Sequence, residues 1–256
     1  MRQIQNKFKI TANEKICPKF YKLSLDAKEM ARSVGPGQFV HIKVTESLEP
    51  FFRRPFSVFR AKKQVEVLYE AVGKGTVALA KREPGEYLDI LGPLGNQFCL
   101  PPKGTKQVVM IGGGIGVAPL MVLSDFLAKE KCEKILLYGA RSKGHVFDLK
   151  DFKKNGCKVF VATDDGSYGV HGRVSELFNK IKTDPQTTAI YTCGPKPMMA
   201  AVKKFSEQNK LNCQASCEEV MACALGACLG CSIKTTKGYR TTCYDGPVFD
   251  IKEVIF

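Results

Sequence analysis

The chain has 256 residues, a formal net charge of +14, 44% hydrophobic residues and 25% charged residues. This is the composition of a globular protein, with enough chain for one large or two ordinary domains and a core that needs no disulfide to stabilise it. Eleven cysteines cannot all pair, and the N-terminal sequence MRQIQNKFKI has no apolar signal region, so a reducing setting fits better than a secreted disulfide framework. We therefore expect a cytoplasmic protein.

Uncharged stretches and the distribution of charge limit the partners. The longest uncharged run, residues 108–124, is interrupted by four glycines and is shorter than a bilayer requires, so we expect no membrane partner. Residues 211–256 carry four basic and five acidic side chains, so the positive excess lies in residues 1–210. The lysines there are scattered and form no aromatic-interleaved basic motif, which favours anionic nucleotides over nucleic acid as ligands.

Residues 1–100 contain short segments with strand-like alternation, separated by turn signals such as GPGQ and PGEY. These segments are residues 20–26, 37–44, 55–61, 64–72 and 86–95. The pattern predicts a small antiparallel β-barrel or sandwich. A pair of prolines marks its expected end, so we predict a first domain over residues 1–102.

Two motifs in this first domain are candidate anion-binding sites. The segment FFRRPFSVF holds four consecutive candidates: Arg54, Pro55, Phe56 and Ser57. The guanidinium of Arg54 can bind a diphosphate with two hydrogen bonds at once. In LYEAVGKGT, Gly75 and Thr76 belong to a second turn that could contact phosphate. Each motif is equally compatible with an ordinary exposed strand and hairpin.

From residue 105 onward, strand-like and helix-like segments alternate, which predicts a parallel, doubly wound α/β domain over residues 103–210. The sequence VVMIGGGIGVAPLMVL is typical of a buried strand, a glycine-rich turn and the start of a helix. The turn glycines are Gly112, Gly113, Gly114 and Gly116. They would let the backbone approach a pyrophosphate at the helix start. Since Ala118 stands near where a dinucleotide-binding fingerprint has its third glycine, close packing of helix on strand is an alternative reason for them.

A second motif strengthens the nucleotide-binding interpretation. AIYTCGPKPMM places Cys193, Gly194 and Pro195 at the carboxyl end of a strand, the edge where α/β sheets hold ligands. Cys193 could lie beside a nicotinamide ring or simply fill the core. Asp164 and Asp165 follow another strand, where they would bind ribose hydroxyls or form a turn.

The most specific signal lies in residues 211–256, which we expect to form a small third module. Cys223, Cys228, Cys231 and Cys243 have the spacing of plant-type [2Fe–2S] ferredoxins, in which one loop wraps the cluster and a remote thiolate completes it. Glycines within the loop permit the tight curl that this wrapping needs. A structural zinc site is the alternative, although zinc usually takes two separated short pairs of cysteines.

In chain order, RPFS, VGKGT, GGGIGVAPL and CGP resemble the ferredoxin-NADP reductase superfamily, in which a flavin-binding barrel precedes a nicotinamide-binding domain. With the tail pattern ExxMxC, GxCxGC and CxDGPVF, nearly the whole chain resembles the electron-transfer subunits of type B dihydroorotate dehydrogenases. The resemblance implies a multi-domain α+β fold with an antiparallel FAD-binding barrel, a doubly wound α/β NAD-binding domain and a small [2Fe–2S] module.

The resemblance also implies which residues hold each cofactor. For FAD they are Arg54, Pro55, Phe56, Ser57, Leu68, Tyr69, Glu70, Gly75 and Thr76. For NAD they are Gly112, Gly113, Gly114, Gly116, Cys193, Gly194 and Pro195. For the cluster they are Cys223, Cys228, Cys231 and Cys243. One departure is Ala224, which stands where the family usually has a glycine after its first ligand.

The implied activity is conversion between two-electron and one-electron chemistry, because a flavin exchanges hydride with a nicotinamide whereas an iron–sulfur cluster moves single electrons. An FMN-containing catalytic subunit would oxidise dihydroorotate to orotate in pyrimidine (UMP) biosynthesis, and this chain would pass the electrons through the cluster and FAD to NAD⁺. The expected assembly is a heterotetramer of two plus two subunits. No residue here resembles a catalytic base for dihydroorotate, which agrees with its oxidation in the partner.

Two alternatives remain. The small flavin and iron–sulfur subunit of a sulfide dehydrogenase or an NADH-dependent ferredoxin-NADP reductase has the same layout, but that group tends to have aspartate where Cys223 stands. A zinc-stabilised scaffold could use the nucleotide fold without electron transfer.

Arg141 follows a predicted strand and leaves NADP open as an alternative to NAD. Cys213 and Cys217 lie outside the motif and are expected to be structural thiols.

Overall fold

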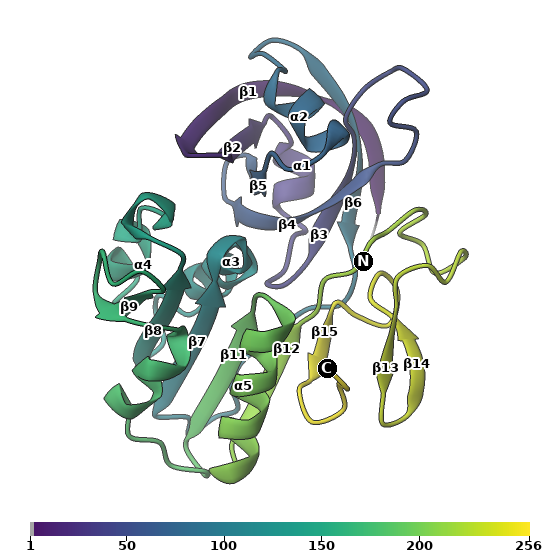
Figure 1. The fold of residues 1–256 in the computed structure, drawn as a ribbon. Helices are drawn as coiled ribbons and strands as arrows, with labels where there is room; N and C mark the ends of the chain where they lie inside the picture. Colours follow the sequence, from purple (N-terminus) through teal and green to yellow (C-terminus); the bar gives the residue numbers. More distant parts are fainter. Residues whose placement is uncertain (1–2) are drawn as a thin grey trace.

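The computed structural model describes residues 3–256 and begins with a closed, six-stranded antiparallel barrel (Figure 1). In spatial order its strands are β1, β2, β5, β4, β3 and β6. Their bounds are Ile4–Cys17 for β1, Phe20–Leu25 for β2, Phe39–Lys43 for β3, Arg54–Ala61 for β4, Val65–Glu70 for β5 and Tyr87–Leu94 for β6. Two short helices, α1 (Lys28–Ala31) and α2 (Lys74–Ala80), lie in the connections. Of the two architectures predicted, the barrel is therefore the correct one.

Alternation along each strand builds the barrel core. Val40 and Ile42 of β3 are fully buried inside the barrel, as expected where successive side chains point to opposite faces. Strand β1 is absent from the segments predicted above because only Phe8 and Ile10 of its fourteen residues are buried. It pairs first with β6 and then with β2, and so it closes the barrel.

A seven-stranded sheet forms the second layer of the molecule, in the order β10, β9, β8, β7, β11, β12 and β15. All neighbours are parallel except β12 and β15, which are antiparallel. The bounds are Gln107–Gly113 for β7, Glu133–Ala140 for β8, Cys157–Thr163 for β9, Val170–His171 for β10, Thr188–Cys193 for β11, Asn212–Ser216 for β12 and Val248–Asp250 for β15. Strands β12 and β15 come from residues 211–256, so the sheet extends into the region predicted as the third module.

Helices cover both faces of this sheet, which confirms the doubly wound prediction. They are η1 (Gly114–Val117), α3 (Ala118–Phe126), η2 (Lys143–His145), α4 (Lys150–Lys154), η3 (Val174–Lys180) and α5 (Lys196–Gln208), where η marks a 3₁₀ helix. Along β7, Val108 and Met110 pack with α3 and α4, whereas Val109 and Ile111 pack with η3 and α5. Within residues 3–256, no helix is long and apolar enough to cross a membrane.

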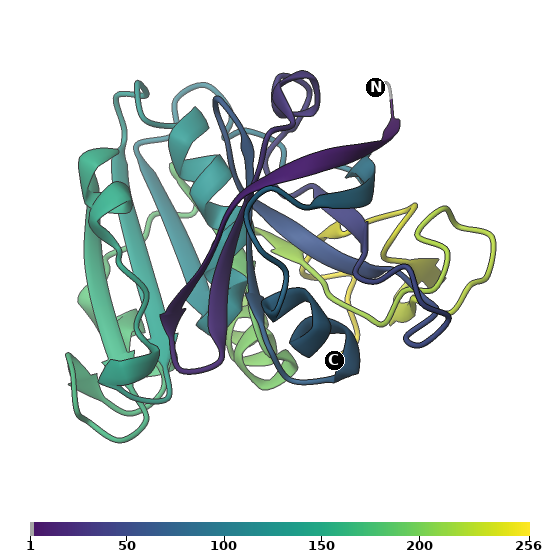
Figure 2. The same ribbon diagram turned by 90° about the horizontal axis from the view of Figure 1, so that it is seen from above.

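Helix α3 joins the two layers, as the view from above shows (Figure 2). Its side chains Met121 and Leu123 belong to the core of the sheet, whereas Val122 packs into the core of the barrel. The helix lies against barrel strand β4. The glycine-rich turn that precedes α3 is therefore held at the border between barrel and sheet.

The C-terminal tail attaches to both layers. It contains a hairpin of β13 (Ser232–Thr235) and β14 (Gly238–Thr241), followed by β15 in the large sheet. At the end of the barrel, the Asn96 side-chain amide donates to the carbonyls of Asp245 and Val248, at 3.0 and 2.8 Å. Its oxygen accepts from the Val248 amide at 2.8 Å. The tail is thus fixed beside the open end of the barrel.

Candidate functional site

A cavity of about 770 Å³ lies where the barrel, the turn before α3 and the tail meet. Its barrel wall contains seven of the residues predicted for FAD, namely Arg54, Pro55, Phe56, Ser57, Leu68, Tyr69 and Glu70. Ile115 closes it from the nucleotide-binding domain, and Met221 and Ala222 close it from the tail. The structure therefore brings segments from three parts of the chain to one hollow.

The two remaining residues predicted for FAD do not line this cavity. Gly75 lies behind Arg54, and a Cβ at that glycine would be 3.0 Å from Arg54 Nε. Thr76 Oγ1 accepts hydrogen bonds from the backbone amides of Val72 and Gly73, at 3.0 and 3.2 Å, and so caps the start of α2. Both residues support the wall rather than form it.

A second cavity, of about 600 Å³, lies at the carboxyl ends of the parallel strands. The residues predicted for NAD that line it are Gly113, Gly114, Gly116, Gly194 and Pro195. Asp164 and Arg141 also line it. Asp165 instead accepts hydrogen bonds from the Ser167 amide and hydroxyl at 3.0 and 2.6 Å, so of the two neighbouring aspartates one faces the cavity and one forms a turn.

The glycine-rich turn and the CGP turn touch backbone to backbone. A Cβ on Gly116 would lie 2.4 Å from the carbonyl oxygen of Cys193, and one on Gly113 would lie 2.7 Å from Met198 Sδ. Gly112 lies behind them, where a Cβ would be 3.3 Å from Leu120. Gly114 differs, because its φ is +54° and its Cβ direction is open. Packing thus accounts for three of these glycines, while Gly114 leaves space at the cavity wall.

Three residues border both cavities: Glu70, Ile115 and Glu218. Glu218 reaches the cavities from the tail. Its Oε1 lies 3.8 Å from Sγ of Cys193, the fully buried thiol of the CGP turn. Burial raises the pKa of both groups. Glu218 is a site residue with no predicted role, although it is the glutamate that opens the tail pattern ExxMxC.

The four motif cysteines gather in the tail as two neighbouring pairs. Cys223 interacts with the thiol of Cys228, and Cys243 interacts with that of Cys231. Cys231 and Cys243 are buried, Cys228 is exposed, and all four are free thiols. Across residues 3–256, no three or more Cys, His, Asp or Glu side chains form a group arranged around a single ion. A [2Fe–2S] cluster takes two protein ligands on each iron, and two adjacent pairs of thiols match that demand.

Backbone amides point at these sulfurs, as expected around a cluster of negative charge. The amides of Leu225 and Cys228 both donate to Cys223 Sγ at 3.4 Å, and the Gly226 amide donates to Cys243 Sγ at 3.2 Å. Burial raises the pKa of the Cys223 thiol, but hydrogen bonds from the Leu225 and Cys228 amides and from the Cys228 thiol outweigh it and lower the pKa to about 7. At Cys243, burial and the neighbouring Cys231 thiol raise the pKa to about 12 despite the Gly226 amide. The amide donors around the sulfurs therefore fit ligands of an iron–sulfur cluster, whose charge they would offset.

The loop needs left-handed backbone at Gly226 (φ +81°), and also at Ala224 (φ +58°) and Leu229 (φ +57°). The family's usual glycine at position 224 is explained by this geometry, since an L-residue there costs about 1 kcal/mol. Ala224 is buried in one apolar cluster with Phe39 and Leu94 of the barrel, which offsets part of that cost. The loop thus holds a left-handed backbone at position 224 with alanine in place of glycine.

Beneath this loop, His41 of β3 is fully buried, and neither ring nitrogen has a hydrogen-bond partner. Burial, with the nearby positive charge of Arg53, lowers the pKa of His41 to about 4. In the unfolded chain this histidine has its ordinary pKa of about 6.5. As the pH falls, the unfolded chain therefore binds a proton at this histidine before the folded protein does. Stability from neutral His41 is therefore fully present above about pH 6.5 and declines as the pH falls towards 4.

We expect the wild-type chain to lose about 2 kcal/mol more unfolding free energy than His41→Leu when the pH falls from 7.5 to 5. The leucine has a similar volume and cannot be protonated. Urea denaturation of both proteins at the two pH values measures the difference. An equal loss in both would show that His41 titrates normally.

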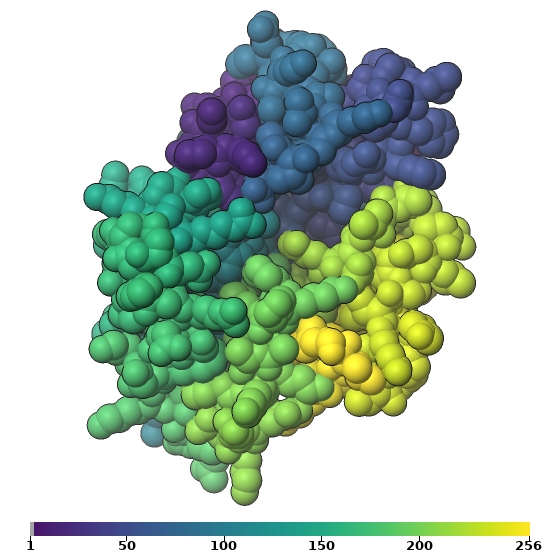
Figure 3. All heavy atoms as spheres, in the orientation of Figure 1, coloured from purple at the N-terminus to yellow at the C-terminus, as the bar shows by residue number. Residues whose placement is uncertain are grey.

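The larger cavity, which contains the residues predicted for FAD and is called the flavin-side cavity below, is contiguous along the chain with the cysteine loop. Met221 and Ala222 line the cavity, and the next residue is Cys223. In the space-filling view, the tail lies against both the barrel and the nucleotide-binding domain (Figure 3). Two cavities and a thiolate loop thus adjoin in series, with Glu218 between the cavities and Met221 between cavity and loop.

Comparisons with known proteins agree with this arrangement. Residues 218–255 match the family model described as the iron-sulfur cluster binding domain of dihydroorotate dehydrogenase B, and residues 110–204 match the oxidoreductase NAD-binding domain. The dihydroorotate dehydrogenase B (NAD(+)) electron transfer subunit of Desulforamulus reducens is 37% identical over 255 residues, 97% of each chain. That of Bacillus caldolyticus is 37% identical over 254 residues, 96% of each chain.

Solved structures show the same fold. An NADH-dependent reduced ferredoxin-NADP oxidoreductase superposes with a TM-score of 0.85 at 26% identity, covering 97% of this chain and 89% of that one. A ferredoxin NADP⁺ reductase from Neisseria gonorrhoeae has a TM-score of 0.68 at 19% identity, covering 80% of this chain and 91% of that one. Fold and site together define an NAD-linked oxidoreductase of the ferredoxin reductase type with an added iron–sulfur domain.

Within that class, the relatives over nearly the full chain settle the family. The chain belongs to the electron transfer subunits of dihydroorotate dehydrogenase B (NAD⁺). The iron–sulfur match spans all four motif cysteines, so the expected cluster, rather than the zinc alternative, agrees with the family.

Proposed function

We propose that this chain passes electrons from an FMN-containing dihydroorotate dehydrogenase subunit to NAD⁺ in pyrimidine biosynthesis, holding a [2Fe–2S] cluster and FAD for that purpose. The observation that carries the proposal is the continuity of Met221, Ala222 and Cys223, which makes one short segment both a wall of the flavin-side cavity and the start of the thiolate loop. The relatives' shared name supports it.

The barrel wall of the larger cavity would bind FAD. Arg54 presents a guanidinium suited to a diphosphate, and Phe56 and Tyr69 offer apolar and aromatic surface. When bound there, FAD would exchange a hydride with a nicotinamide and release electrons singly. Ile115 and Glu218, which border both cavities, would hold the two rings against each other and exclude water.

The smaller cavity would bind the dinucleotide. Amides of the turn around Gly114 would face the pyrophosphate, and Asp164 would accept hydrogen bonds from ribose hydroxyls. Cys193, buried and protonated behind the CGP turn, would orient Glu218 through its weak hydrogen bond. The three predicted parts, residues 1–102, 103–210 and 211–256, would thus serve FAD, NAD and the cluster in turn.

The partner would dock over the cysteine loop. Apolar side chains around it are exposed, with Val220 at 84%, Leu229 at 63% and Tyr244 at 74%. Exposed apolar groups gathered around a redox loop mark an interaction surface. We propose that the partner is the catalytic subunit, in a heterotetramer of two plus two. Eleven free thiols support a reducing, cytoplasmic location.

Copurification tests this function. Pull-down of the tagged chain from its native source should recover an FMN-containing protein, and the complex should form NADH when dihydroorotate and NAD⁺ are added. A glutamate-synthase-like partner with no activity on dihydroorotate would instead favour a role like that of the ferredoxin-NADP oxidoreductase subunits.

A further inference from the structure

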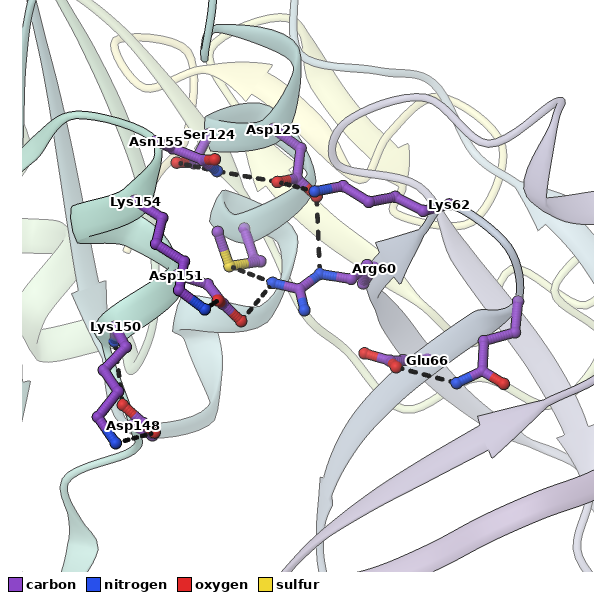
Figure 4. A network of polar contacts seen from close by, with 12 residues as sticks. Arg60, Lys62, Glu66, Ser124, Asp125, Asp148, Lys150, Asp151, Lys154 and Asn155 are labelled. Carbon is purple, nitrogen blue, oxygen red and sulfur yellow. Dashed lines mark hydrogen bonds and ion pairs between the residues drawn. The ribbon is translucent and has the colours of Figure 1, made fainter.

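A polar network outside both cavities connects the barrel to the nucleotide-binding domain (Figure 4). Its centre is Arg60, near the end of β4. One terminal nitrogen of Arg60, Nη2, donates to Asp151 Oδ2 of α4 at 2.7 Å and lies 3.5 Å from Met121 Sδ of α3. Nε lies 3.7 Å from Asp125 Oδ2, also on α3. A single barrel side chain thus contacts two helices of the other domain.

Asp125 extends the network in both directions. Its Oδ1 accepts from Nζ of Lys62 on the barrel side at 2.9 Å and from Nδ2 of Asn155 at 2.8 Å. Asn155, at the end of α4, also donates to Ser124 Oγ at 3.1 Å. The network therefore ties β4 to α3 and, at the same time, α3 to α4.

Burial distinguishes these contacts from ordinary surface pairs. The side chains of Arg60 and Asp125 are 21% and 12% exposed, so solvent screens their attraction only in part. Hydrogen bonding to Arg60 lowers the pKa of Asp151, so that carboxylate stays charged well below neutral pH. Lys62 is 59% exposed and makes a peripheral contact by comparison.

The elements joined in this way carry the two binding sites. Strand β4 begins with Arg54 and Ser57 in the flavin-side cavity and reaches Arg60 at its other end. Helix α3 follows directly on the glycine-rich turn of the nucleotide cavity and ends beside Asp125. A rotation of α3 on β4 would therefore change how the two cavities face each other. Val122 provides apolar contact between these elements, and the charged contacts of Arg60 add a directional constraint to that packing.

We propose that Arg60 is a positioning residue, whose clamp on Asp125 and Asp151 sets the angle between the barrel and the nucleotide-binding domain and so aligns the flavin and nicotinamide cavities. This inference rests on the proposed exchange of hydride between the two sites. Arg60 itself touches neither cavity, so it acts through the alignment of β4 and α3.

The test is Arg60→Met in the full chain loaded with FAD and cluster. Methionine keeps most of the apolar length against Met121 and removes the charge. The rate of flavin reduction at saturating NADH, followed anaerobically by stopped flow, should fall about tenfold or more, because misplacing reacting groups by about 1 Å is that costly. The dissociation constant for NADH should stay within about twofold, since the residues of its cavity are unchanged.

Lys62→Met is the matched control, because it removes a positive charge from the same edge and the same aspartate. It should leave the rate within about twofold of wild type. The double variant Asp125→Asn/Asp151→Asn removes the two carboxylates that Arg60 contacts, and it should lower the rate of flavin reduction as much as Arg60→Met does. Adding Arg60→Met to this double variant should lower the rate little further. A rate for Arg60→Met close to wild type, or an equal loss in Lys62→Met, would overturn the proposal.

Hydrogen exchange gives a readout independent of activity. Amides of α3 should exchange faster in Arg60→Met than in Lys62→Met, while those of β1 and β6 on the far part of the barrel stay unchanged. Unaltered exchange in α3, or faster exchange through the whole barrel, would contradict a clamp between domains. If the wild-type protein accepts no electrons from NADH, the proposed function fails, but the exchange experiment still tests the clamp.

Discussion

Replacing Cys228 with serine should abolish the [2Fe–2S] cluster while leaving bound FAD in place. The change removes one of two thiols in the Cys223–Cys228 pair, and one iron then lacks half of its protein ligands. The barrel residues that line the larger cavity, from Arg54 to Ser57 and from Leu68 to Glu70, are unchanged in this variant. The purified variant should lack acid-labile sulfide and the EPR signal of the reduced cluster, and it should keep the flavin absorbance.

Cys99→Ser is the matched control. Cys99 is also exposed, but its backbone contacts Gln214 and Tyr191 rather than the cysteine loop. Its iron, sulfide and EPR signal should equal those of the wild type. A normal cluster signal in Cys228→Ser would show that the ligand assignment is wrong.

Replacing Gly116 with alanine should disable the nucleotide site. The added Cβ would lie 2.4 Å from the carbonyl oxygen and 2.6 Å from the carbonyl carbon of Cys193, and 2.8 Å from Cα of Gly194. All three are backbone atoms, so the two turns must move apart. Such overpacking costs about 2–3 kcal/mol of stability. Because the turns form the cavity wall, flavin reduction by NADH should fall roughly a hundredfold.

Gly144→Ala in the same domain is the control for this substitution. The nearest atom to its added Cβ is Ser142 Oγ at 3.8 Å, an ordinary contact, and we expect near-normal stability and reduction rate. Thermal unfolding and anaerobic stopped flow measure both effects. A Gly116→Ala protein that reduces flavin at the wild-type rate would contradict the backbone contact between the turns.

Much of the fold follows from local periodicity. Strand β9 (Cys157–Thr163) and helix α5 (Lys196–Gln208) lie in the region where the sequence predicts alternating strands and helices. Strand β1 is not predicted from periodicity, because it faces solvent along most of its length and its apolar residues do not alternate regularly with polar ones. The segment Val174–Lys180 forms a 3₁₀ helix, which periodicity over two turns does not distinguish from an α-helix.

The candidate site likewise has features that the local sequence predicts and contacts that it does not predict. The cysteine spacing is a local signal, and the structure brings the four thiols together. Contacts between distant segments are not local signals: Glu218 meets Cys193 across 25 positions, and Arg60 meets Asp151 across 91. The packing of Gly112 behind the nucleotide cavity, and the backbone contact of Gly116 with Cys193, likewise depend on which segment lies opposite.

The most direct test of electron transfer within this chain is anaerobic addition of NADH to the purified, fully loaded protein, followed by freezing and EPR. The arrangement of nucleotide cavity, flavin-side cavity and thiolate loop in series predicts that NADH alone produces the reduced-cluster signal, at an intensity close to that produced by dithionite. A strong signal with dithionite and none with NADH, in protein that contains both FAD and iron, would contradict it.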